Sequence, residues 1–244
     1  MNLVLFLCVL MVFVWVVNRF SILAWIFFLL IPLFYFIFGF KGFDLPVFVY
    51  IKIFLVVTGM LWILFLRYSR IAKGRWPFFI LYLIVLLNIL VVVVYEQSIG
   101  IVFNTIAGIF LLLTLPNGNH IKIDKKSKTK DLLWDIPFLW IICYTLWDWS
   151  FCYSSYTVAS KVFFVLLLAP IIFEVIKRKT YLQVRAYTLA FYLLLFLYQK
   201  TFLSALNATR QPNVILLATF EYLSFSCCLL YFGYFMFKKY RKST

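Results

Sequence analysis

Charged side chains interrupt several long apolar runs of this sequence, and they are the residues with the clearest chemical potential. They are Lys52, Lys161, Lys200, Asp148 and Glu221. A charge that faced lipid would cost at least about 2.5–3.5 kcal/mol, so such residues usually face one another or water. They predict a shared polar pocket. The alternative is that the lysines reach the membrane surface on their long stems, or that ion pairs with the acids only lock helices together.

Aromatic side chains lie beside one of these acids. At about 100° per residue, Trp140, Tyr144 and Trp147 fall on one helix face, and Asp148 borders that face. Trp and Tyr rings attract cations, so this wall could receive an organic cation or a neighbouring lysine. Aromatic packing and interfacial anchoring are the simpler explanation. Asn88 lies near the middle of another apolar run, where it indicates an interhelical hydrogen bond or a ligand group.

The elements that position these residues must be dissolved in lipid. The chain has 244 residues, of which 66% are hydrophobic and 13% charged, and its mean hydropathy is +1.04. Soluble domains are about 45–50% apolar and about 25% charged, so a soluble globule is excluded. The apolar runs are about twice the length of a membrane-barrel strand. Only helices then satisfy the backbone, at about 20 residues for each crossing.

Polar connectors divide the chain into nine predicted helices and one integral membrane domain, 1–244. The first run shows no cleavage site, and Asn18 and Arg19 lead directly into another apolar run, so we expect it to be retained rather than removed as a signal peptide. The fold class is therefore an all-α polytopic bundle. The nine ranges are 2–17, 20–40, 46–66, 77–94, 98–116, 134–152, 157–176, 186–206 and 213–237.

Basic residues indicate the orientation of this bundle. Nine spans place alternate connectors on opposite sides, and one side then carries only Lys41 and Arg210. The other side carries Arg19; Arg67, Arg70, Lys73 and Arg75; Lys122, Lys125, Lys126, Lys128 and Lys130; Lys177, Arg178, Lys179 and Arg185; and Lys238, Lys239, Arg241 and Lys242. Because cytoplasmic loops retain Lys and Arg, we expect the amino terminus outside and the carboxyl terminus in the cytoplasm.

The same rule explains the formal net charge of +15 without a nucleic-acid partner. The longest connector, 117–133, contains the only histidine, His120, and is predicted to be a solvated cytoplasmic loop, with anionic lipid headgroups as a second possible environment. The five cysteines lie in apolar runs without a C-x-x-C pair and are interpreted as small hydrophobic residues. We expect no metal site and no cofactor.

One run carries a repeat of small residues. Gly100, Asn104 and Gly108 recur every four residues and predict a close-packing seam between helices. Motifs of hydrolases, zinc proteases and phosphate-binding loops are absent from the sequence, which argues against an enzyme.

The stretch from Asp124 to Phe191 resembles an uncharacterised family of bacterial multi-pass membrane proteins, classed only as a domain of unknown function. The residues that carry the resemblance are Asp124-Lys125, Trp134, Leu139-Trp140-Ile141-Ile142, Tyr144, Leu146-Trp147, Tyr153, Leu182-Gln183, Arg185-Ala186 and Thr188-Leu189-Ala190-Phe191. Weaker similarity occurs at Lys52, Asn88-Ile89-Leu90, Asn104 and Ile106-Ala107-Gly108. The resemblance implies a bacterial cytoplasmic membrane and brings no activity with it.

The leading expectation is a transporter or channel-like protein for a small solute or ion, with an outward-facing polar pocket. In it Lys52, Lys200, Asp148 and Glu221 would contact an anionic, zwitterionic or cationic solute. Asn88, Trp140, Tyr144 and Trp147 complete the set of pocket candidates. The alternative is a membrane receptor or accessory subunit that binds a partner through its aromatic sixth helix.

Overall fold

The computed structural model describes residues 2–34, 37, 47–69, 72, 74–155, 157, 159–198 and 212–241. Nine α-helices lie within these residues and confirm the all-α class, since each predicted range holds one of them. They are α1 (Leu3–Arg19), α2 (Ser21–Phe34), α3 (Val47–Tyr68), α4 (Trp76–Ser98), α5 (Val102–Leu113), α6 (Phe138–Ser155), α7 (Ser160–Ile176), α8 (Tyr181–Tyr198) and α10 (Val214–Tyr240).

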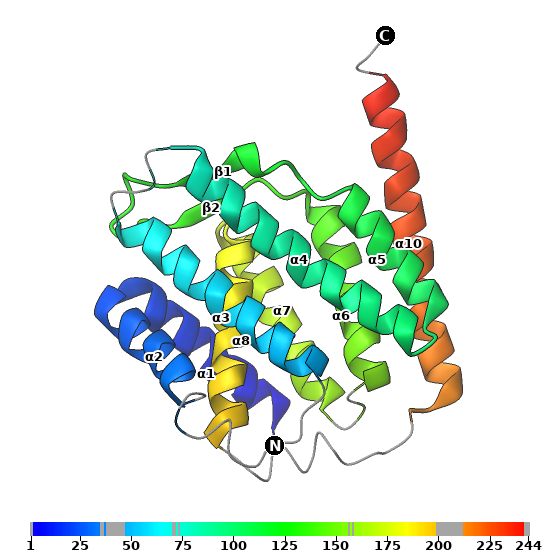
Figure 1. The fold of residues 1–244 in the computed structure, drawn as a ribbon, viewed down its shortest axis with the longest axis horizontal. Coiled ribbons are helices and arrows are strands. Elements are labelled where there is room, and N and C mark those ends of the chain that lie inside the picture. Colours follow the sequence, from blue (N-terminus) through cyan, green and yellow to red (C-terminus); the bar gives the residue numbers. More distant parts are fainter. Residues whose placement is uncertain are drawn as a thin grey trace.

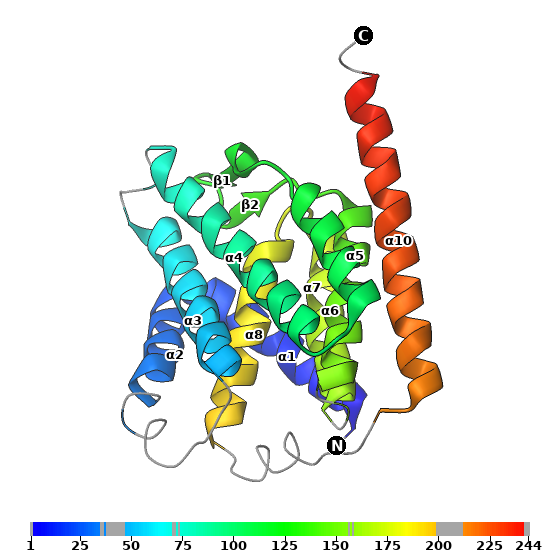
Figure 2. The same cartoon turned by 45° about the vertical axis from the view of Figure 1, so that its right-hand side comes forward.

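The helices form a bundle with α8 in its interior (Figure 1). Helix α3 packs against α4 and α8, while α7 packs against α8, α1 and α6. Helix α10 lies at one side against α5 and α6, and its carboxyl end extends past the bundle (Figure 2). Core side chains gather between α1, α4, α5, α6 and α7, with a second cluster among α1, α2, α3 and α8.

Three helices in the described ranges, α3, α4 and α10, are long and apolar enough to cross a membrane. Helices α1 and α2 pass the same test only as a pair, and that pair is bent by 115°. Helix α5 has 12 residues, or about 18 Å at 1.5 Å per residue, which is short of a hydrocarbon core of about 30 Å. The range 98–116 predicted for it was too long, because a turn at Ile99–Ile101 and the 3₁₀ helix η2 (Gly118–His120) bound it.

The connector 117–133 is not an irregular loop, so that part of the prediction was wrong, although its lysines are exposed as expected. Its strand β1 (Ile121–Ile123) pairs antiparallel with β2 (Leu132–Trp134), with Ile121 opposite Trp134. Ile121, Leu132 and Trp134 are all buried, since one face of the hairpin packs on the helix ends. The predicted start of the sixth helix at 134 was wrong for the same reason: Trp134 belongs to the hairpin, and α6 begins after Pro137.

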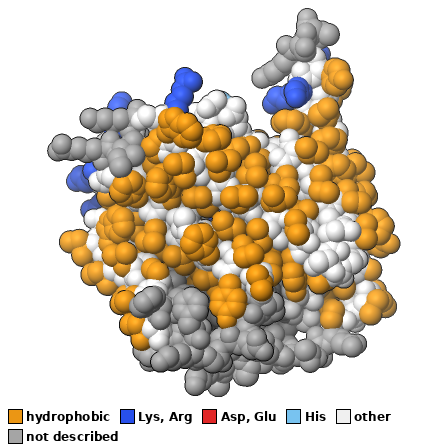
Figure 3. All heavy atoms as spheres, in the orientation of Figure 1, with side chains coloured by type: hydrophobic (Ala, Val, Ile, Leu, Met, Phe, Trp, Pro, Cys, Tyr) orange, Lys and Arg blue, Asp and Glu red, His pale blue; other side chains and the backbone are white. Residues whose placement is uncertain are grey.

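Apolar side chains cover the face of the molecule seen in Figure 3, and Lys and Arg lie at its upper margin. On α10 large hydrophobic side chains such as Val214, Ile215 and Leu230 are at least 75% exposed. In water such a surface would associate or precipitate. The helices are thus compatible with a membrane protein.

The predicted close-packing seam of small residues is confirmed at Gly108 and wrong at Gly100. A Cβ on Gly108 would lie 2.5 Å from Val93 Cγ2 and 2.9 Å from Trp147 Nε1, so only glycine lets α5 approach α4 and α6 this closely. Gly100 lies outside α5, in the turn after α4, where its φ of +80° suits glycine. Asn104 does not simply pack in the seam, because its side chain is hydrogen-bonded in the core.

We therefore expect Gly108→Ala to lower the free energy of unfolding by about 1–3 kcal/mol, because a methyl group is forced into a filled core. Thermal unfolding of the purified protein in detergent measures it. Gly233→Ala is the matched control: Gly233 is also helical, its added Cβ meets nothing within 4 Å, and alanine favours helix. Equal stability of the Gly108 and Gly233 variants would contradict the close approach.

Candidate functional site

A buried ion pair joins α6 to α8. Arg185 Nη2 donates to Asp148 Oδ2 at 2.6 Å, and the two side chains are only 6% and 7% exposed. The sequence placed Arg185 in a cytoplasmic connector, which is wrong because α8 begins earlier than predicted. The Glu174 carboxylate accepts the backbone N–H groups of Lys179 and Tyr181 and so caps the start of α8.

Arg185 keeps unused donors beside this pair. Its Nε and Nη1 atoms are buried and make no hydrogen bond to any described residue, and the same holds for Asn88 Oδ1 and Trp134 Nε1. A buried donor or acceptor without a partner costs about 1–3 kcal/mol. Such groups gathered around one place indicate a site for water or a small polar ligand.

These residues line one cavity of about 60 Å³ between α3, α4, α6, α8 and the hairpin. Asn88, Trp140, Tyr144, Trp134 and Arg185 all contribute to its wall, and the remaining lining is mainly aliphatic. The volume suits a few water molecules or a small ion, and it is well below the roughly 300 Å³ of the smallest usual ligand pockets. The lining runs from the middle of α3 and α4 to Trp134 in the hairpin and takes in the first half of α8, so the cavity extends from the middle of the bundle toward its hairpin end.

The predicted charged residues converge only in part. Lys52 donates from Nζ to the Asn88 carbonyl at 3.0 Å, and it interacts electrostatically with Asp148 and Arg185. Lys161 is exposed on α7, as a lysine that reaches the surface would be. Glu221 is half-buried on α10, away from the cavity lining, and makes no ion pair with a described residue. Lys200 lies outside the described residues.

The aromatic residues of α6 are buried rather than displayed. Trp140 stacks on Tyr144 with ring centroids 5.3 Å apart, and Trp147 lies 5.8 Å from Tyr144. All three rings are less than 9% exposed. Among the described residues no cation lies over these rings, so in this structure all three serve packing, and Trp140 and Tyr144 also line the cavity.

Trp147 belongs to a polar cluster that the sequence did not reveal. Its Nε1 donates to Glu96 Oε2 at 3.2 Å and to the Asn104 carbonyl at 3.0 Å. Asn104 Nδ2 donates in turn to Glu96 Oε1 and to the Trp147 carbonyl. Glu96 is fully buried at the end of α4. The available signal was a carboxyl group closing an apolar run without a neighbouring basic residue in the sequence.

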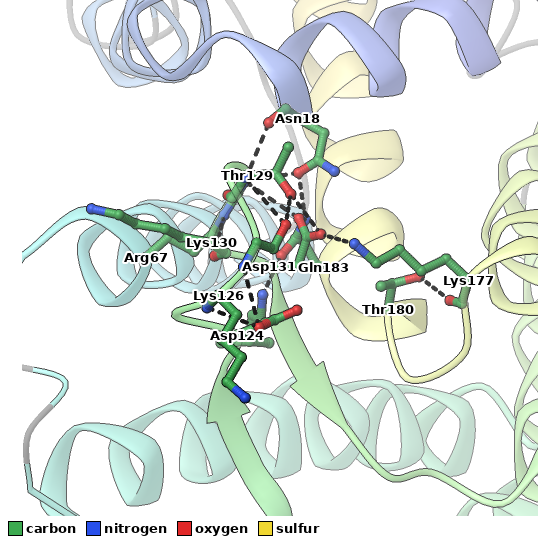
Figure 4. Close-up of polar contacts among 12 residues, drawn as sticks. Asn18, Arg67, Asp124, Lys126, Thr129, Lys130, Asp131, Lys177, Thr180 and Gln183 are labelled. Atoms are coloured by element: carbon green, nitrogen blue, oxygen red, sulfur yellow. Dashed lines mark hydrogen bonds and ion pairs between the residues drawn. The ribbon is translucent and has the colours of Figure 1, made fainter.

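A second network closes the hairpin end of the bundle, and Asp131 is at its centre (Figure 4). The Asp131 carboxylate pairs with Lys177 and accepts hydrogen bonds from Thr129 Oγ1 at 2.8 Å and Gln183 Nε2 at 3.3 Å. Arg67 Nη2 lies 3.6 Å from Asp131 Oδ1. Burial alone would raise the pKa of the Asp131 carboxyl, but hydrogen bonds from Lys177 and Thr129 outweigh it and hold this pKa below its ordinary value.

Arg67 and Gln183 extend this network to the other helices. Arg67 donates from Nη2 to Asn18 Oδ1 at 2.8 Å, from Nε to the Lys130 carbonyl at 3.1 Å, and from Nη1 to the Tyr187 hydroxyl. Gln183 Nε2 also donates to Asn18 Oδ1, at 2.7 Å, and its Oε1 accepts the N–H of Leu132. One network therefore joins the ends of α1, α3 and α7, the start of α8, and the hairpin.

Two connector residues were assigned to the wrong environment. Arg67 and Arg185 were counted as solvated basic residues, yet both are at most 5% exposed and are bound by partners within the bundle. The sequence also grouped these connectors on one side of the bundle. In the structure the end of α1, the end of α3, the hairpin and the α7–α8 turn do meet at one end.

Comparison with known proteins now adds the family. A model described as a family of unknown function (DUF5692) matches residues 99–244. The chain belongs to this family. The matched segment holds Asp131, Asp148, Gln183 and Arg185, whereas Lys52, Arg67 and Asn88 precede it. No curated protein and no solved structure matches the chain.

We expect Asp131→Asn to destabilise the protein by about 3 kcal/mol or more, because it leaves the buried Arg67 guanidinium without its carboxylate. Asp135→Asn is the matched control. Asp135 also pairs with a lysine, Lys179, but the two side chains are 60% and 40% exposed, and such surface pairs contribute about 1 kcal/mol or less. Thermal unfolding in detergent compares them.

The pH dependence of the same variants tests the cause. A carboxyl whose pKa is lowered on folding stabilises the protein above its ordinary pKa of about 4 and loses that contribution as pH falls through the lowered value. The difference between wild type and Asp131→Asn should therefore be constant from about pH 5 to 7 and shrink below about pH 4. A difference that stays unchanged on acidification would refute the electrostatic explanation.

Proposed function

We propose that the chain is a multi-pass protein of the bacterial cytoplasmic membrane that crosses the bilayer nine times, with its amino terminus outside and its carboxyl terminus in the cytoplasm. The support is that basic residues of four connectors meet at the hairpin end, which the positive-inside rule places in the cytoplasm. Short α5 and the α1–α2 pair would cross where the bilayer is locally thinned, since apolar side chains at their ends, such as Leu5 and Leu113, are exposed.

Thiol labelling in cells tests this orientation. Lys126→Cys in the hairpin should react with a membrane-impermeant thiol reagent only after the membrane is opened, whereas Gln97→Cys at the opposite end of α4 should react in intact cells. Both side chains are exposed, and the parent chain with its own five cysteines gives the background. Labelling of the hairpin variant in intact cells would reverse or reject the topology.

For the activity, we propose a transporter or channel-like protein that binds a small anionic or zwitterionic solute at Arg185. The observation that carries the proposal is the buried guanidinium, two of whose nitrogen atoms, Nε and Nη1, bond to no described residue beside a cavity. Asp148 would hold and orient the guanidinium, and Lys52 would add positive charge. An intramembrane ionisable residue of this kind is a functional candidate by default, since its burial is costly.

The size and the position of the cavity both bear on this proposal. A solute larger than a few atoms would enter only if α8 or α4 moved, as alternating access requires. The cavity also lies toward the hairpin end, so in the proposed orientation it belongs to the cytoplasmic half of the bundle, whereas the sequence suggested the outer half. The receptor alternative would need another surface, because the rings of Trp140, Tyr144 and Trp147 are buried.

Thermal stabilisation by chloride, acetate, glycine and glutamate tests the solute site. We expect at least one of them to raise the Tm of the wild type and not that of Arg185→Lys, which keeps the charge for Asp148 but loses the planar set of donors. A solute at 100 times its Kd contributes about 2.7 kcal/mol, which is about 5–10 °C in Tm at this chain length.

Lys161→Ala is the control, because it removes an exposed intramembrane lysine far from the cavity lining. It should respond to solute as the wild type does. Stabilisation that is absent from the wild type, or equal in the wild type and Arg185→Lys, would remove the support for this function.

A further inference from the structure

A second and larger cavity opens between the start of α4 and the hairpin. Its volume is about 980 Å³, and it is lined from α4 by Trp76, Phe78, Phe79 and Tyr82 and from the hairpin side by Leu115 and Ile121. Arg75, Asn117 and Asn119 complete the lining with polar side chains, all three of them exposed. The proposed solute site does not use this cavity, since the two cavities share no lining residue.

The walls of this cavity are fixed by the fold. A Cβ on Gly118 would lie 2.9 Å from Tyr82 Cβ, so glycine allows the hairpin backbone to rest directly on α4. The Tyr82 ring meets the buried Trp134 ring edge-on, with centroids 6.3 Å apart. Trp62 Nε1 donates to the Pro77 carbonyl at 2.8 Å and holds the start of α4 to α3. These contacts hold the elements that form the cavity wall against one another.

The lining has the chemistry of an amphiphile site. Aromatic rings form one part, and a guanidinium with two amides forms the other, as a site for an apolar chain with a polar headgroup requires. Trp76 is 74% exposed and Phe79 is 47% exposed, so the aromatic side faces outward from α4, where lipid would lie. An amphiphile can therefore enter from the bilayer without first crossing water.

The basic residues in and near the cavity favour an anionic headgroup. Arg75 lies in the lining, and the exposed lysines Lys122, Lys125, Lys126 and Lys128 follow in the hairpin. No carboxylate is among the described residues that line the cavity. Basic clusters at the cytoplasmic surface bind anionic lipids, and arginine suits the oxygens of a phosphate group.

We propose that this cavity binds an amphiphile with an anionic phosphate headgroup, supplied by a phospholipid of the surrounding leaflet, with Arg75 at the phosphate and the α4 aromatic residues along the acyl chain. The site is separate from the proposed solute site, and it stands or falls independently of it.

Native mass spectrometry of the purified full-length protein tests the proposal. Detergent-solubilised protein is mixed with phosphatidylglycerol or with phosphatidylcholine, and the fraction of chains that retain one lipid is measured. The wild type should retain phosphatidylglycerol in preference to phosphatidylcholine. Arg75→Ala should retain about fivefold less, which is the effect of one basic residue on an anionic lipid.

Arg19→Ala is the control, because Arg19 is an exposed arginine at the same end of the bundle and outside the cavity. It should retain lipid as the wild type does, and Tm values of both variants show that they are folded. Equal losses in the two arginine variants, or equal retention of the two lipids, would overturn the site. A third arm adds inorganic phosphate: stabilisation by phosphate that depends on Arg75, without retention of phosphatidylglycerol, would assign the cavity to a soluble phosphate compound and refute the lipid.

Discussion

A charge that is removed from water needs a partner, and the arrangement of this bundle follows from that requirement. Few charged residues occur in the helices, and those that are buried are held by specific atoms: Arg185 by Asp148, and Arg67 by Asp131 and backbone carbonyls. Each pair comes from different elements. These pairs tie α6 to α8 and α3 to the hairpin at fixed positions along each element, which apolar contacts alone do not specify as sharply.

The two ionic pairs differ in how completely they are satisfied. Among the described residues, both carboxylate oxygens of Asp131 have partners, and that network closes one end of the bundle (Figure 4). Arg185 instead uses one of its nitrogen atoms for Asp148 and leaves two without a bond to any described residue. A complete network is suited to holding helices together, whereas an incomplete one beside a cavity is suited to receiving something else.

Much of the fold could be predicted from the sequence, because the length of the apolar runs and the polar connectors between them indicate which segments are helices. The errors occur where long-range contacts decide. Leu132 was assigned to a polar loop and Trp134 to the start of a helix, but both belong to one strand, which pairs with Ile121–Ile123. Arg185 looks like a connector residue because its partner Asp148 is 37 positions away.

The candidate site was predicted only in part for the same reason. Lys52, Asn88, Trp140, Tyr144 and Asp148 do lie near Arg185, because polar groups in an apolar bundle are stabilised by one another. Glu96 was missed because its partners, Asn104 and Trp147, are neutral and give no signal of charge pairing. Residue type alone could not distinguish Glu221, which lies apart on α10.

The contact between Asn18 and Gln183 spans 165 positions of the chain. A ribosome that releases this polypeptide from its amino end must therefore complete α8 before α1 can find its final neighbour. Until then the hydrogen bond between Asn18 and Gln183 is missing, and the network around Arg67 lacks its α8 members. Formation of α1 to α7 and closure of their common end are consequently separate events in time, and the eighth helix determines when the second one occurs.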